Sequence, residues 1–543
     1  MSYLLNNNVN VQNNNIIVST SNPLPVTAAI SGTVTVEPPS AASSVTAFGE
    51  PLALTLTPVI QLDGIYGITS EVIQTYTNGT GAGAGGDLQM FYANCGTDVG
   101  GYGVVRSKRF IRYRAGQGAL ARFTAMFDAG VAATTTRAGL ISQEQALMFG
   151  YNGTKFGILR ANGGKAHITV LTITTAPTGS QVCTVTLNGV AFTVSVTSGT
   201  TTEAAVEIAN RVGGYTGWLV QQVDNTIVFL ANALEVKSST FSFAYTSGTG
   251  TQIVGSFSTK QVGVAQTTNW TYQEDWNIDC LGKANTVTNI MGPNPSGMTL
   301  DPSKLNVYQI NYRWLGAGQL SFAVEDQTTG NMIFVHKIHY VNQHTVPHIA
   351  NPSFKVGFVS YSLGGTTNMT VRGASIMAAI EGDIRQNELN RSHSATVSST
   401  LTQNQLHHLM TVYNPLVTNG KSGALNGNYI INAKEFLLKD ISAAVKSTDP
   451  SIIYIFFEPT SFSGTHSYTS NPKNNGLISE VVGTLDDTVD TAICQFALGV
   501  NGEAQYKLSD FRIAVPPGSY VSIGIRSTAS IGTTNMALVW SED

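Results

Sequence analysis

Six basic side chains lie close together in the chain and form its densest concentration of charge. They are Arg106, Lys108, Arg109, Arg112, Arg114 and Arg122. Successive side chains of a strand point to opposite faces, so on a strand Lys108, Arg112 and Arg114 share one face. A row of cations of this kind suits a polyanion such as a polysaccharide, or acidic groups of a neighbouring subunit; the alternative is a solvated face. Nucleic acid is not expected, because the net charge of the chain is −4 and no broad basic surface is present.

Two further groups of residues have the types that bind metals. His336, His339, His344 and His348 fall in one short segment, and neutral imidazole is a common ligand. However, His336 and His339 are three apart in a predicted strand, which places them on opposite faces. Asp275, Asp279 and Asp301 carry oxygens that suit calcium, but their spacing is not that of an EF-hand loop. Ordinary structural roles are therefore preferred for both groups.

Motifs typical of enzymes are not found. No pair of carboxylates stands out for glycoside hydrolysis, and no phosphate-binding loop, dinucleotide-binding fingerprint or nucleophile elbow is present. We therefore expect no catalytic, cofactor-binding or metal-binding residues and no enzymatic activity. The four cysteines, Cys95, Cys183, Cys280 and Cys494, are widely separated, which favours buried free thiols over a zinc site or a dense disulfide framework.

The composition indicates a folded, sheet-rich protein. Only 11% of the 543 residues are charged, against about 25% in ordinary soluble domains, and the aromatic content of 9% is too high for a disordered chain. No apolar run approaches the roughly 20 residues of a membrane span. The first residues, Met1 to Asn8, lack the features of a signal peptide. We therefore expect synthesis in the cytoplasm, without export through a signal peptide and without membrane insertion.

Strand patterns occur on both sides of a long interruption. Short apolar runs at 110–114 and 119–127 surround a turn at 116–118, and the runs 147–151 and 154–159 are joined by Asn152-Gly153, a strong hairpin signal. After the interruption, 307–314 and 319–324 form another predicted hairpin around 316–318. Turn signals recur about every 8–12 residues, which indicates an antiparallel, jelly-roll-like β-sandwich built from both halves.

The interruption has a different pattern. A hairpin is predicted over 183–196 around Asn188-Gly189. Thr200 and Glu203 have capping-box spacing and open a helix that reaches Val212. A second pair of strands, 217–220 and 226–230, is joined across Asp224-Asn225. This ββαββ unit is predicted to be inserted into a sandwich loop, which loops tolerate well.

The two ends of the chain add further segments. The first 48 residues contain short β-prone fragments interrupted by prolines, so they read as an anchoring or intersubunit arm or as a flexible leader. Residues 401–410 are predicted to be partly helical. Residues 411–543 are predicted to form a β domain with one helix at 433–445. The predicted organisation is as follows: an N-terminal arm (1–48), a discontinuous β-sandwich (49–165 and 266–377), an inserted α/β module (166–265), a partly helical linker (378–410) and a C-terminal β-sandwich domain (411–543).

Several segments resemble structural proteins of tailed phages and of large DNA viruses of algae. The family module opens with an Asp-x-Phe-Gly-Arg-Leu-Arg-Val-like motif, present here in altered form at Thr46–Ala53. The resemblance continues through the basic-aromatic segment Arg106–Gly116 and returns at Trp276–Asp279, Pro295–Asp301 and Trp314–Gly318. Together these segments span roughly half of the chain, in the family's order.

The resemblance implies a virion protein of a tail fibre, baseplate or capsid-attached appendage, with no catalytic residues to carry over. Expected partners are other copies of the chain in a homotrimer, virion proteins bound through the arm, and host-surface glycans. Two alternatives stay open: a capsid decoration or vertex protein, and a carbohydrate-active enzyme (depolymerase) on a sandwich scaffold. The residues assigned to contact a polyanion or a neighbouring subunit are Arg106, Lys108, Arg109, Arg112 and Arg114.

Overall fold

The computed structural model describes most of the chain. The described ranges are 12–13, 16–17, 55–113, 116–197, 199–284, 294–313, 316–382, 389–418, 429–460, 462–470, 476–485 and 491–542. The chain divides into two units, residues 1–54 and 55–543. In the first unit, β1 (Gln12–Asn13) pairs with β2 (Ile16–Ile17) in antiparallel fashion. The rest of the predicted arm and the opening motif at 46–53 lie outside the described residues.

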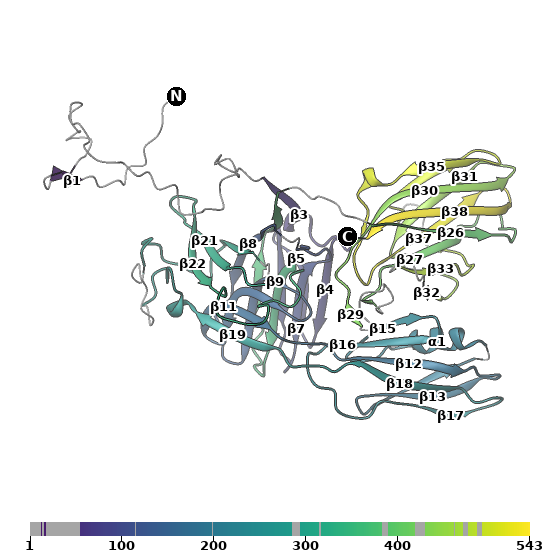
Figure 1. The fold of residues 1–543 in the computed structure, drawn as a ribbon, viewed down its shortest axis with the longest axis horizontal. Helices are drawn as coiled ribbons and strands as arrows, with labels where there is room; N and C mark the ends of the chain where they lie inside the picture. Colours follow the sequence, from purple (N-terminus) through teal and green to yellow (C-terminus); the bar gives the residue numbers. More distant parts are fainter. Residues whose placement is uncertain are drawn as a thin grey trace. The chain divides into compact units, whose positions relative to one another are not determined.

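The second unit is mainly β, as predicted, and its named strands pair in antiparallel sheets (Figure 1). Its first part is a β-sandwich of a seven-stranded and a nine-stranded sheet. The seven-stranded sheet consists of β19 (Thr267–Tyr272), β11 (Lys155–Asn162), β10 (Ala146–Asn152), β9 (Thr134–Ile141), β23 (Lys355–Ser362), β7 (Tyr102–Ser107) and β4 (Ile73–Asn78). The nine-stranded sheet consists of β22 (Met332–Ile338), β21 (Leu320–Glu325), β20 (Asn306–Tyr312), β8 (Ala119–Phe127), β24 (Thr370–Gly373), β6 (Met90–Cys95) and β5 (Ala82–Asp87), with β25 (Ser375–Glu381) and β3 (Leu56–Asp63) attached.

One hydrophobic core joins the strands that precede the interruption to those that follow it. Phe149 lies on β10, and its ring is 4.8 Å from the ring of Tyr308 on β20 and 6.2 Å from that of Trp276. All three side chains are fully buried. Neither half of the chain therefore closes this core without the other.

The predicted hairpins of the sandwich are confirmed. Strands β10 and β11 pair from Asn152 opposite Lys155, and Gly153 in the turn has a φ of +59°. Strands β20 and β21 pair from Tyr312 opposite Leu320. The predicted strand at 110–114 is wrong for its described part, since β7 ends at Ser107 and Ile111 forms only an isolated bridge with Phe354.

The inserted segment has its own core and two sheets. One sheet contains β15 (Trp218–Val223), β16 (Thr226–Ala231), β12 (Ile168–Thr175) and β18 (Val254–Gln261), and the other contains β14 (Val190–Val196), β13 (Gln181–Leu187) and β17 (Ser242–Gly248). In the predicted β13–β14 turn, Asn188 and Gly189 have φ angles of +52° and +83°. The helix α1 (Thr201–Ala209) begins at the predicted capping box and ends earlier than Val212.

The last part of the chain is a jelly roll. One sheet has the order β26 (Leu389–Val397), β38 (Ile531–Glu542), β30 (Phe436–Ser447) and β35 (Glu503–Lys507). The other contains β27 (His407–Tyr413), β37 (Tyr520–Ser527), β31 (Ser451–Phe457) and β34 (Cys494–Leu498) in that order, extended by the short strands β33 (Leu477–Ser479) and β32 (Thr469–Ser470). The first of these eight long strands thus pairs with the last, and consecutive strands lie in different sheets except for β31 and β34, which is the double Greek-key arrangement of jelly rolls.

The helix predicted at 433–445 is wrong, because this segment forms β30. Its buried residues are Phe436 and Leu438, then Ile441, Ala443 and Val445. A register shift between Leu438 and Asp440 inserts one residue into the alternation, so the spacing from Leu438 to Ile441 imitates a helical period. The expected helical character of 378–410 is also absent from its described part, which contains the end of β25, all of β26 and the start of β27.

All four cysteines are buried and free, as predicted. Among the described residues, no helix combines the length and the apolar character needed to cross a bilayer.

Candidate functional site

The outward face of the sheet β26-β38-β30-β35 carries a wide groove. Side chains alternate along each strand, so Ala395, Ile441 and Leu538 are buried in the core, while their neighbours point outward. The groove has a volume of about 730 Å³. It belongs to one sheet of one domain, and strands far apart in the sequence build it together.

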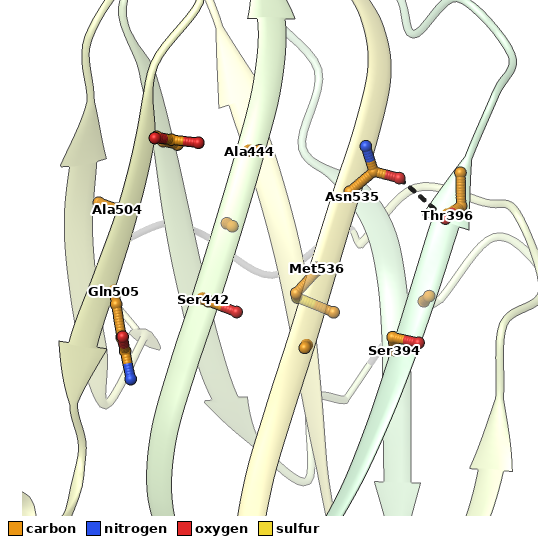
Figure 2. Close-up of a pocket in the computed structure, with 12 residues that line it drawn as sticks. Ser394, Thr396, Ser442, Ala444, Ala504, Gln505, Asn535 and Met536 are labelled. Atoms are coloured by element: carbon orange, nitrogen blue, oxygen red, sulfur yellow. Dashed lines mark hydrogen bonds between the residues drawn. The ribbon is translucent and has the colours of Figure 1, made fainter.

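Strand register arranges the outward side chains of the groove in two rows across the sheet (Figure 2). The first row is Thr396, Asn535, Ala444 and Glu503, and the second is Ser394, Ala537, Ser442 and Gln505. The Thr396 hydroxyl donates a hydrogen bond of 2.9 Å to Asn535 Oδ1. Ala537, Ser442 and Ala444 on the two central strands have short side chains, while Glu503 and Gln505 on the β35 edge have longer ones.

The chemistry of the groove is polar and nearly uncharged. Its outward groups are hydroxyls, amides and methyl groups, and Glu503 is the one acid among the lining residues. Hydroxyls both donate and accept hydrogen bonds, and amides offer one acceptor and two donors. Such a surface can bind a neutral, hydroxyl-rich ligand. Hydrolysis by a pair of carboxylates requires a second acid, which the lining does not supply.

The basic residues predicted as a contact surface do not share one strand face. Lys108 Nζ lies 2.5 Å from Glu458 Oε2, and Arg109 Nε lies 3.0 Å from Glu435 Oε2. Both acids belong to the jelly roll, so these two cations form ion pairs within the chain. The Arg106 Nε group donates to Gln74 Oε1 at 3.1 Å.

The other basic residues of the predicted surface are Arg112, Arg114 and Arg122. Arg112 lies in the irregular segment after β7, and Arg114 lies outside the described residues. On β8, Arg122 Nε donates to Gln309 Oε1 at 2.8 Å. Among the described cations, Lys108 and Arg109 pair with acids, and Arg106 and Arg122 donate to glutamine side chains.

The clustered histidines have packing and hydrogen-bonding contacts, and two of them, His344 and His348, contact the same ring, that of Tyr340. Burial lowers the pKa of both His336 and His348 to about 4, and His336 Nδ1 accepts a hydrogen bond from the Asn277 amide at 3.3 Å. His344 stacks on Tyr340, with ring centroids 4.1 Å apart. Within the described ranges, no three histidine, cysteine, aspartate or glutamate side chains are grouped to hold a metal.

Two of the three aspartates weighed for calcium cap backbone turns. Asp279 is buried, and its carboxylate accepts hydrogen bonds from the Leu281 and Ser296 amides at 2.8 and 3.0 Å. Asp301 accepts from the amide and hydroxyl of Ser303. These bonds give both carboxylates a structural role.

Sequence reasoning missed the groove. The sequence contains one signal of the groove, which is the small outward residues at alternate positions, such as Ser392, Ser394 and Thr396 on β26. Runs of this kind are common in a chain rich in serine and threonine. Only the strand order of the jelly roll shows that they face the same surface as Ser442 and Ala537.

Comparison with known proteins gives fold likeness at low similarity. No protein-family model matches the chain, and no curated protein matches it. Among solved structures, a lectin from Bauhinia forficata in complex with GalNAc is 9% identical, with a TM-score of 0.21, over 60% of this chain and 98% of the lectin. A chain of the Sulfolobus turreted icosahedral virus is 9% identical, with a TM-score of 0.13, over 88% of this chain and 91% of that chain. A chain with a triple jelly roll fold from an archaeal virus is 10% identical, with a TM-score of 0.12, over 88% of this chain and 90% of that chain. At these TM-scores the likenesses carry no argument about function, which is inferred below from the residues of the chain itself.

Proposed function

We propose that this chain is a non-enzymatic structural protein of a virus particle, in a tail fibre, baseplate or capsid-attached appendage, and that the groove of its jelly roll binds a host-surface glycan. The groove is the observation that carries the glycan part of this proposal. The virion part rests on the sequence resemblance and on the arrangement of a β-sandwich followed by a jelly roll, an architecture used by viral capsid and lectin domains.

The lining of the groove favours a neutral glycan over other ligands. Its volume of about 730 Å³ falls in the range of about 300–1,000 Å³ that is typical of ligand sites. Hydroxyl and amide groups from all four strands converge on it, and they match the hydroxyl groups of sugars. Glu503 is exposed at one edge, where a carboxylate can accept hydrogen bonds from sugar hydroxyls.

In this proposal the chain assembles with itself as a homotrimer and contacts other virion proteins through residues 1–48. A capsid decoration protein would differ in its position on the particle and not in its chemistry. A depolymerase would need a second carboxylate within reach of Glu503. Binding without cleavage is therefore the outcome we expect at this groove.

The test is a binding assay with a panel of bacterial and algal surface polysaccharides, combined with sizing of the recovered polymer. Ala444→Trp places a large ring on the floor of the groove, while Lys446→Trp places the same ring two residues along the same strand, outside the lining. We expect wild type and Lys446→Trp to bind the same polysaccharide. Ala444→Trp should bind it at least about tenfold more weakly, which is a loss of about 1.4 kcal/mol of binding free energy. The polymer should stay intact in all three cases. Equal binding by both variants, no binding by wild type, or a shortened polymer would refute the proposal.

A further inference from the structure

Lys355 is a buried lysine without an acidic partner in the described residues. It begins β23 of the sandwich and is 6% exposed. Its ammonium lies 3.3 Å from Gln74 Oε1 and 4.8 Å from the centre of the Phe110 ring. Lysines are almost never this buried unless paired, so this position calls for an explanation.

A second cation uses the same oxygen. Arg106 Nε donates to Gln74 Oε1 at 3.1 Å, so one neutral amide oxygen serves both Lys355 and Arg106. In the described part of the chain, no carboxylate lies within 4.0 Å of either cation. Two acids are nearby but are engaged elsewhere: Glu435 accepts from Arg109 and from the Phe110 amide, and Glu144 accepts from the Ala166 amide.

Both cations line a cavity of about 80 Å³. Gln74, Asn351, Ser353 and Glu144 also line it, together with apolar side chains such as Leu219, Leu416 and Ile431. A water molecule occupies about 30 Å³ of liquid volume, and the cavity therefore has room for about three waters. That volume suits a tetrahedral oxyanion and is too small for a sugar ring.

The electrostatics of the cavity favour an added negative charge. Burial lowers the pKa of Lys355 well below its ordinary value, and Arg106 and Lys108 lower it further, while Glu435 raises it. Burial also raises the pKa of Glu144, which reduces the charge that this carboxyl presents to an anion in mildly acidic solution. An unpaired buried cation is costly, and a bound anion would offset that cost.

We propose that this cavity binds a small oxyanion of the phosphate or sulfate class, with Lys355 and Arg106 as its cationic contacts. Lys355 and Arg106 belong to the sandwich, and the cavity is also lined by Leu219 of the inserted segment and by residues of the last part of the chain, such as Leu416 and Asn432. None of its lining residues lines the glycan groove. The site is therefore independent of the proposed function.

The test measures the midpoint temperature of thermal unfolding (Tm) of the full chain as the phosphate or sulfate concentration is raised. Chloride keeps the ionic strength constant. Three variants complete it: Lys355→Met, which keeps the apolar length of the side chain; Arg106→Gln, which removes the second cation; and Lys507→Met, a control at an exposed lysine. Sulfate and phosphate stabilise most proteins weakly by exclusion from the surface, so the response of Lys355→Met gives the background.

We expect wild type and Lys507→Met to gain a saturable rise of about 2–4 °C above that background. Arg106→Gln should require several-fold more anion for the same rise. Glucuronate, which carries its carboxylate on a sugar ring, should produce no rise above background. A wild-type response equal to that of Lys355→Met, or a larger response to glucuronate than to phosphate and sulfate, would overturn the assignment.

Discussion

At the scale of single residues, the interior keeps several titratable side chains uncharged. His408 is the clearest case, since it is 1% exposed and both of its ring nitrogens have partners. Its Nδ1 lies 2.7 Å from the Val481 carbonyl oxygen, to which it donates, so Nε2 accepts from the Thr411 hydroxyl at 2.8 Å. Burial lowers the pKa of His408 to about 4, so the folded protein contains the neutral ring at neutral pH.

This pKa predicts a loss of stability in acid. The histidine pKa is about 6.5 in the unfolded chain, so between pH 6.5 and 4 the unfolded state binds more protons and stability falls as the pH falls. His408 alone should lower the free energy of unfolding by about 2 kcal/mol between pH 7 and pH 5. Denaturant unfolding of wild type and His408→Gln at both pH values measures this difference.

His408→Gln should make the free energy of unfolding less sensitive to pH. It should not remove the sensitivity, because the pKa values of His336, His348 and His466 are also lowered to about 4. His466 lies next to His408, with ring centroids 5.5 Å apart. An unchanged difference between pH 7 and pH 5 in the variant would contradict the prediction.

At the scale of elements, the sequence predicted correctly those turns and helix ends that are determined by a few adjacent residues. The helix α1 begins as the sequence indicates, because Thr200 and Glu203 bond each other's backbone amides. The β13–β14 turn forms because Asn and Gly tolerate the left-handed backbone that a tight hairpin requires. In these cases two to four adjacent residues determine the geometry.

The capping box supports a second prediction. Thr200→Ala removes the side-chain oxygen that accepts from the Glu203 amide at 3.2 Å, and loss of an N-cap of this type costs about 1 kcal/mol. Hydrogen exchange of the α1 amides should therefore be faster by about fivefold. Thr202→Ala, inside the helix, is the matched control and should leave exchange unchanged or slower, because alanine is the better helix former. Equal exchange rates in wild type and Thr200→Ala would show that the cap contributes nothing.

The wrong helix at 433–445 shows where local signals fail. Residues of this segment such as Ala433, Lys434 and Glu435 favour helices, and the bulge near Lys439 disguises the alternation of a strand. Pairing with β38 along nearly the whole strand outweighs these preferences. The sequence also did not predict the groove or the Lys355 cavity, because each combines residues that are distant in sequence.

At the scale of the whole molecule, separate hydrophobic cores stabilise the sandwich, the inserted segment and the jelly roll. Both apolar and polar contacts join them: Val228 and Leu230 of the insert share an apolar cluster with Val417. Lys108 and Arg109 pair with Glu458 and Glu435 of the jelly roll, and Gln222 of the insert accepts a hydrogen bond from the Tyr468 amide at 2.7 Å. None of these contacting residues lines the groove of the jelly roll.

We propose that this chain is a structural subunit that assembles with copies of itself, and its mass in solution tests this proposal most directly. Light scattering should be measured on the full chain and on a variant lacking residues 1–48, over a range of concentrations. The account predicts three times the chain mass of 57.5 kDa for the full chain, and a single chain for the truncated variant if the arm is an assembly element. A full chain that stays monomeric at every concentration would contradict the account.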